Sequence, residues 1–156
     1  MRFEFLFLGK TKEPFLAAGI EHFLKRLTHY VPTEIRIVKE KRWSAQEAED
    51  KIREEEGKLL LARLSRPSLV VALDPGGRQA SSEELATMMG GWQEAGHRCV
   101  SFLIGGPLGL PAKLVAQADV TLSLSRMTFT HDMARLLLVE QLYRAFTIRA
   151  GTGYHK

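Results

Sequence analysis

The chain has 156 residues, of which 45% are hydrophobic and 26% are charged, and its formal net charge is +4. This length and composition are typical of one globular domain, so we expect residues 1–156 to form a single domain. No apolar run approaches the roughly 20 residues of a membrane-spanning helix, and the chain does not begin like a secretory signal, so no membrane association is expected. Cys99 is the one cysteine, which excludes an intrachain disulfide and favours a cytoplasmic location.

Strand-like and helix-like patterns alternate along the whole chain. Ser44–Glu47 and Ser81–Glu84 have the spacing of capping boxes, and each predicts the start of a helix. Residues 69–73 are a continuous apolar run, typical of a strand buried on both faces of a parallel sheet. The expected strands cover residues 3–9, 34–38, 69–73, 99–104 and 120–124. The expected helices cover residues 13–30, 44–64, 81–94, 111–116 and 131–148.

This order of elements predicts an α/β fold with an open, mostly parallel sheet and helices on both faces. Ligands of such sheets bind at the carboxyl ends of the strands, near the point where the strand order reverses. Three strand ends are therefore candidates for a site. They are the turn expected at Asp74–Gly77, the glycine turn Gly105–Gly109, and the segment Leu124–His131.

The glycine turn reads Gly-Gly-Pro-Leu-Gly and follows a buried strand. Its spacing differs from the G-x-G-x-x-G of dinucleotide-binding folds, Pro107 lacks an amide donor, and no Walker-type lysine follows. This pattern disfavours a phosphate site. It favours either a tight strand–helix connection or a pocket for a small, mostly uncharged part of a ligand.

The segment Leu124–His131 joins a strand to a helix over eight residues without a glycine or a proline. Tertiary packing must then hold its path, because no turn residue does. Such a segment is a candidate to surround a ligand with backbone groups, and the alternative is a packed connection with no further role.

The last expected helix is apolar around almost its whole circumference, which indicates a buried helix or one that also forms a homodimer interface. His131 and Arg135 share one of its faces, as do Glu140 and Arg144. The alternatives are a histidine at a helix end and a surface ion pair. No pair of histidines has metal-ligand spacing with supporting ligands, and no nucleophile elbow is present, so neither a metal site nor a hydrolase is expected.

Charge is uneven along the chain. Residues 1–42 carry nine Lys and Arg against five Glu, residues 43–125 carry eight against eleven acidic residues, and residues 126–156 carry five against two. Basic ends are compatible with a polyanionic partner such as RNA. A net charge of +4 is nevertheless modest for a nucleic-acid-binding protein, so charge alone favours an ordinary solvated surface.

Five motifs in order resemble one known family. The chain contains Phe-Leu-Ile-Gly-Gly-Pro at 102–107, Leu-Ser-Leu-Ser-Arg-Met-Thr-Phe at 122–129, and His131 four residues before Arg135. These are followed by Glu-Gln-Leu-Tyr-Arg-Ala-Phe at 140–146 and by Tyr-His-Lys at 154–156. Together they are similar over the full length to the ribosomal RNA large subunit methyltransferase H family, which belongs to the SPOUT class. Leu108 and Thr130 depart from the family, where Thr130 often corresponds to a proline.

The resemblance implies a deep trefoil knot over about residues 101–156 and a homodimer with active sites at the interface. It implies S-adenosyl-L-methionine as methyl donor, no metal, and methylation at N3 of a pseudouridine in the helix 69 loop of 23S rRNA on the assembled ribosome. The family's cofactor positions correspond to Leu73, Gly105, Leu124, Ser125, Arg126, Met127, Thr128 and Phe129.

The N3–H proton of the acceptor must leave near the time of methyl attack, so a base or a stabilising cation is expected. The candidates are His131, Arg135, Tyr154 and His155, and residues of the tail could act across a dimer. Arg144, Arg149 and Lys156 are the candidate RNA-binding residues. Two other functions stay open: a non-catalytic ribosome-binding or assembly factor with the same fold, and a flavodoxin-like nucleotide-binding module.

Overall fold

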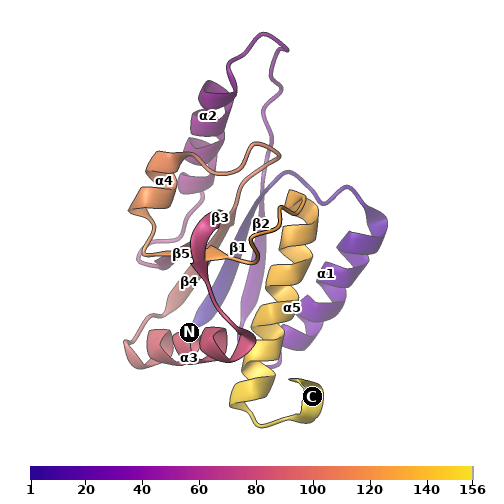
Figure 1. Cartoon of the computed structure of the whole chain (residues 1–156), viewed down its shortest axis with the longest axis vertical. Coiled ribbons are helices and arrows are strands. Elements are labelled where there is room, and N and C mark those ends of the chain that lie inside the picture. Colours follow the sequence, from indigo (N-terminus) through magenta and orange to yellow (C-terminus); the bar gives the residue numbers. More distant parts are fainter. Residues whose placement is uncertain (156) are drawn as a thin grey trace.

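A computed structural model of the chain describes residues 1–155 (Figure 1). The strands are β1 (Arg2–Leu8), β2 (Thr33–Val38), β3 (Leu69–Gln79), β4 (Cys99–Ile104) and β5 (Val120–Ser123). The helices are α1 (Pro14–Leu27), α2 (Glu49–Leu61), α3 (Ser82–Glu94), α4 (Ala112–Gln117) and α5 (His131–Arg149), and the 3-10 turn η1 (Gly153–His155) follows. No helix in residues 1–155 has the length and apolarity to cross a membrane.

The five strands form one parallel sheet in the order β2-β1-β4-β3-β5, which confirms the expected fold class. The direction of the strand order reverses next to β1, which pairs with β2 on one side and with β4 on the other. The carboxyl ends of β3, β4 and β5 therefore lie together at one edge of the sheet, where α/β proteins bind ligands.

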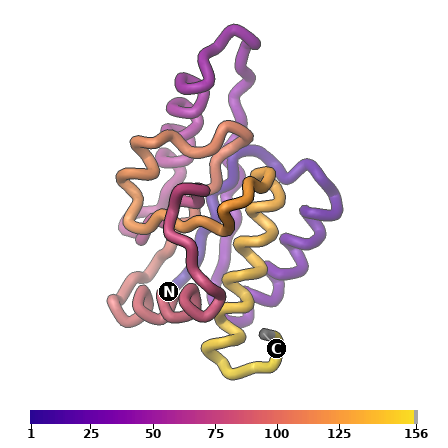
Figure 2. The backbone as a smooth tube through the Cα atoms, viewed as in Figure 1, coloured from indigo at the N-terminus to yellow at the C-terminus, as the bar shows by residue number. Residues whose placement is uncertain are grey.

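Helices cover both faces of the sheet (Figures 1 and 2). Phe3, Phe5 and Phe7 face a large core formed with α1, α3 and α5, while Leu6 and Leu8 face a smaller core formed with α2 and α4. This division follows from the alternation of side chains along β1, since successive residues point to opposite faces of a sheet.

The expected helix start at Ser44 is wrong. Helix α2 begins at Glu49, its N-cap Ala48 contributes no side-chain bond, and residues 44–47 form an isolated turn in which the Glu47 amide donates to the Ser44 carbonyl at 3.1 Å. The Glu47 carboxylate pairs with Lys51 Nζ at 2.8 Å. By contrast, Ser81 caps α3 with the full expected capping box.

The turn expected at Asp74–Gly77 is also wrong, because β3 continues through these residues to Gln79. The pairing with β5 shifts between Leu73 and Arg78, so the four residues form a bulge inside a strand rather than its end. A Cβ on Gly77 would lie 2.8 Å from the Thr121 backbone, so this close strand contact requires glycine.

Candidate active site

A pocket of about 720 Å³ opens at the carboxyl ends of β4 and β5 and at the bulge in β3. This volume is in the range of ligand-binding clefts in proteins, and the lining is mostly apolar with a few polar groups. The pocket is lined by Arg53, Leu73, Asp74, Pro75, Ile104, Gly105, Gly106, Pro107, Leu108, Gly109, Leu110, Leu122, Leu124, Ser125, Met127, Thr128, Phe129, Thr130, His131 and Ala134. The three segments that the sequence indicated thus contribute to one site, although the first of them is a bulge inside β3 and not a strand end.

The glycine turn folds tightly back on itself along one wall. Gly106 and Gly109 form an isolated bridge, and Gly109 has a φ of +78°, which a residue with a side chain rarely adopts. A Cβ on Gly105 would lie 2.5 Å from the carbonyl carbon of Gly109. The absence of a side chain at Gly105 therefore keeps the backbone of the turn close and leaves its polar groups near the pocket.

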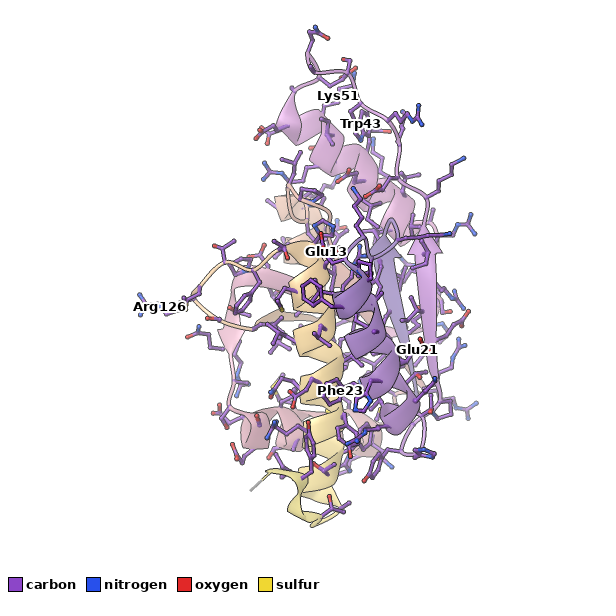
Figure 3. All side chains as sticks on the ribbon, turned by 90° about the vertical axis from the view of Figure 1, so that its right-hand side faces the viewer. Glu13, Glu21, Phe23, Trp43, Lys51 and Arg126 are labelled. Atoms are coloured by element: carbon purple, nitrogen blue, oxygen red, sulfur yellow. The ribbon has the colours of Figure 1, made fainter. Side chains whose placement is uncertain are left out.

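The segment 124–130 forms the opposite wall and is held by its own side chains. Ser123 Oγ donates to the Ser125 carbonyl at 3.0 Å, and the Met127 amide donates to Ser125 Oγ at 2.9 Å. The Met127 side chain is 74% exposed and that of Phe129 is 38% exposed, so apolar surface faces solvent at the pocket mouth. Arg126 is absent from the lining and points outwards (Figure 3).

Thr130 ends this segment and begins α5. Its φ of −61° and ψ of 152° are angles that a proline also adopts, and its hydroxyl accepts a hydrogen bond from the Met133 amide at 3.2 Å. Threonine at this position thus has a backbone conformation that is also open to proline, and its hydroxyl caps α5.

His131, one of the candidate catalytic residues, lines the pocket directly. Burial lowers the pKa of His131, the Arg135 cation lowers it further, and the Asp132 carboxylate opposes both. Its Nε2 lies 3.3 Å from Asp132 Oδ1. The lowered pKa favours the neutral imidazole, which has one nitrogen that can accept a proton.

Arg135 is fully buried beneath the pocket and is not in its lining. Its guanidinium donates to the Leu8 carbonyl and to Thr11 Oγ1, and it lies 3.0 Å from Asp132 Oδ1. Asp132 in turn accepts from the Lys12 amide at 2.9 Å. This buried pair fastens the β1–α1 loop to the first turn of α5, which carries His131.

Tyr154 lies in a second cluster farther along α5. Its hydroxyl donates to Glu140 Oε1 at 3.1 Å, and the Arg144 guanidinium bonds the same oxygen at 2.7 Å and lies 5.0 Å from the Tyr154 ring centroid. Burial and Glu140 raise the pKa of Tyr154. Nine residues of helix separate Glu140 from His131, about 14 Å at 1.5 Å per residue.

The remaining candidates lie at this end of α5 or beyond it. Arg149 donates to Gln93 Oε1 at 3.2 Å. The side chain of His155 and the whole of Lys156 lie outside the described residues. The structure thus brings His131 together with all the cofactor candidates except Arg126, and it separates Tyr154 and Arg149 from them.

Arg53 from α2 and Ala134 from α5 line the pocket but lie outside the segments that the sequence indicated. Nothing local in the sequence marks either of them as a site residue. Asp74 and Pro75 lie in the segment 74–77, and Thr130 lies in the segment 124–131, both of which were candidates from the sequence. Among residues 1–155, no group of three or more His, Cys, Asp or Glu side chains is placed to hold a metal ion.

Comparison with known proteins decides the family. A family model described as "Predicted SPOUT methyltransferase" matches residues 1–155. The chain belongs to the SPOUT methyltransferase family. A relative from Desulfotalea psychrophila, named ribosomal RNA large subunit methyltransferase H, is 53% identical over 156 residues, and the match covers 100% of both chains. A relative of the same name from Halothermothrix orenii is 43% identical over 159 residues, again with 100% of both chains covered.

A similar fold is also found among solved structures. A probable methylase family protein from Haemophilus influenzae aligns with a TM-score of 0.52 at 14% identity, over 99% of this chain and 70% of that one. This level of identity supports the fold assignment alone.

Proposed function

We propose that this SPOUT protein is a homodimeric methyltransferase that uses S-adenosyl-L-methionine to methylate N3 of a pseudouridine in the helix 69 loop of 23S rRNA. Its substrate is the assembled ribosome, and its location is the cytoplasm. The relatives' names support a substrate in large-subunit rRNA, and the family motifs of the sequence support the finer assignment.

The observation that carries the proposal is the pocket between the glycine turn and the segment 124–130. Its volume of about 720 Å³ accommodates a nucleoside-sized ligand, and its walls offer apolar side chains and backbone groups. Pro107 removes one amide donor from the turn, which suits a ligand without phosphates. Leu73, Gly105, Leu124, Ser125, Met127, Thr128 and Phe129 are the residues that would hold the methyl donor.

The donor supplies an electrophilic methyl group on a sulfonium, and the protein contributes position, a water-poor environment and proton transfer. We assign proton acceptance to His131, because it lines the pocket and because its lowered pKa favours the neutral imidazole. Exposed Met127 and Phe129 at the mouth offer apolar surface on which the target base would pack.

Arg135 acts as a positioning residue in this proposal. Its buried guanidinium touches the Leu8 carbonyl, Thr11 and Asp132, so it would reach the substrate only after these contacts broke. The intact network keeps the first turn of α5, and with it His131, in a fixed place relative to the β1–α1 loop.

The tail acts across the dimer. Glu140 holds Tyr154 about 14 Å along α5 from His131, so a direct role for Tyr154 or His155 in this subunit's pocket is disfavoured. Phe15 on α1 is 67% exposed, and α1 packs along α5, so an apolar surface is present for a second subunit. Arg144, Arg149 and Lys156 would then contact RNA beside the partner's pocket. We further propose that about residues 101–156 form the trefoil knot, with the segment 124–130 between β5 and α5 threaded through it.

Two measurements test the function. Calorimetric titration with S-adenosyl-L-methionine should give one site per chain, and no binding at millimolar ligand would refute the cofactor assignment. Methyl incorporation should occur into ribosomes and not into free rRNA, and it should disappear with ribosomes that lack the helix 69 pseudouridine. Ribosome binding without methyl transfer would instead support a non-catalytic assembly factor.

A further inference from the structure

Two loops that precede helices carry a group of exposed cations beside the pocket. Lys10 and Lys12 lie in the β1–α1 loop, and Lys39, Lys41 and Arg42 lie in the β2–α2 loop. We call these five residues the strand-end cation surface. Within the described part of the chain, none of their side chains forms an ion pair with a carboxylate at 4 Å or less.

The β1–α1 loop is fixed next to the pocket wall. The Lys12 amide donates to Asp132 Oδ2 at 2.9 Å, and Thr11 Oγ1 accepts from Arg135 at 3.1 Å. Both partners belong to the first turns of α5, which begin with the pocket residue His131. Lys10 and Lys12 therefore stand beside the proposed proton acceptor.

The β2–α2 loop packs on the first loop. The Gly9 amide donates to the Val38 carbonyl at 2.8 Å, and a Cβ on Gly9 would lie 2.4 Å from the Glu40 carboxyl group. The loop continues to Trp43, which is labelled in Figure 3. Lys41 Nζ lies 4.8 Å from the centroid of the Trp43 ring. Trp43 neighbours the Glu56 carboxyl group, which lies under Gly106 of the glycine turn.

The two loops together carry five cations against Glu13, Glu40 and Glu47. The Glu47 carboxylate pairs with Lys51 of α2 at 2.8 Å. Glu40 lies over Gly9 and close enough to His131 and Arg135 to affect their pKa values, so its charge is directed towards the interior cations. The exposed charge at this edge is therefore positive. The candidate RNA-binding residues of α5 differ, because Arg144 is held by Glu140 and Arg149 by Gln93.

We propose that the strand-end cation surface binds the phosphate backbone of the RNA that enters the pocket of the same subunit. This inference rests on the proposed function and names its substrate-binding element. Long, flexible lysine side chains are suited to contacts with phosphate groups. Phosphate contacts do not distinguish one base from another, so the target base would be recognised in the pocket. Contacts of this kind strengthen ground state and transition state equally, so they affect KM and not kcat.

The test compares two double variants that each remove two exposed positive charges. Lys39→Ser with Arg42→Ser removes charge from the surface, and Arg63→Ser with Arg98→Ser removes it near the amino ends of β3 and β4, at the opposite edge of the sheet. Methyl transfer to assembled ribosomes is measured at a series of KCl concentrations, and ribosome binding is measured by cosedimentation.

The first variant should raise KM for ribosomes about tenfold with kcat unchanged, and lower the slope of log affinity against log salt by roughly 2. Its affinity for S-adenosylhomocysteine should equal that of the wild type, and the control variant should behave as wild type in every assay. Wild-type KM and salt slope in the first variant, or equal losses in both variants, would overturn the proposal. Absence of methyl transfer by the wild type would refute the proposed function instead, and cosedimentation would still decide the role of the surface.

Discussion

The glycine turn provides the sharpest structural prediction, through Gly105→Ala. The added Cβ would lie 2.5 Å from the Gly109 carbonyl carbon, 2.7 Å from its oxygen and 2.8 Å from the Leu110 amide nitrogen. All three atoms are backbone, so no side chain can rotate away, and the turn must open by about 0.5 Å or more. Such overpacking costs about 1–3 kcal/mol of unfolding free energy.

The same movement displaces one wall of the pocket. We therefore expect Gly105→Ala to lower the affinity for S-adenosylhomocysteine at least tenfold, which corresponds to about 1.4 kcal/mol, measured by calorimetry. Thermal denaturation should show a Tm lower by about 2–4 °C per kcal/mol lost, as is usual for a chain of this size.

Gly91→Ala is the matched control. Gly91 lies in α3, and a Cβ there would have nothing within 4 Å. Because alanine favours a helix over glycine, this change should stabilise the protein by about 0.5–1 kcal/mol and leave ligand affinity unchanged. A Gly105→Ala variant with wild-type affinity and Tm would refute the account of the turn.

Three further predictions concern α5. Asp132→Ala should cost about 3–5 kcal/mol in denaturant unfolding, because it leaves the Arg135 charge buried without its partner. Lys25→Ala breaks an exposed pair with Glu21 and should leave unfolding nearly unchanged; equal losses in the two variants would show that burial of the Asp132–Arg135 pair does not matter. Thr130→Ala should remove the α5 cap and cost about 1 kcal/mol, and an unchanged Tm would argue against the cap. Folding lowers the pKa of His131, so the unfolded chain binds this proton more readily than the folded chain does. The contribution of His131 to the free energy of unfolding is therefore complete above the ordinary histidine pKa of about 6.5. It is lost as the pH falls through the pKa of the folded state. Unfolding measured from pH 7.5 to 5 should thus show a steeper loss for the wild type than for His131→Gln, and parallel curves would exclude this contribution.

Local patterns were sufficient for most of the fold. The alternation of Phe3, Phe5 and Phe7 placed β1, and the apolar run 69–73 placed the buried part of β3, because both signals depend only on neighbouring residues. The capping box at Ser81 was correct and the one at Ser44 was wrong for a physical reason. Glu84 returns its carboxylate to the Ser81 amide at 2.7 Å, whereas Glu47 bonds Lys51.

The site was predictable to the level of segments and not to the level of contacts. The order of strands indicated which loops would meet, since parallel strands end at one edge. The burial of Arg135 depends on Leu8 and Thr11, which are 127 and 124 residues away in sequence, and no local pattern encodes that pairing. The hydrogen bond between Tyr154 and Glu140 could not be predicted from the sequence either, because the glycine-containing tail has no periodic pattern that indicates its path.

If this chain methylates the large-subunit rRNA as proposed, mass spectrometry of the helix 69 fragment will detect the product. Ribosomes from a strain that lacks the protein are incubated with S-adenosyl-L-methionine and either the wild type or Gly105→Ala. We expect one added methyl group on the pseudouridine with the wild type and a much slower addition with the variant. A fragment that stays unmethylated while the wild-type protein binds both ribosome and methyl donor would show that the chain does not methylate this nucleotide.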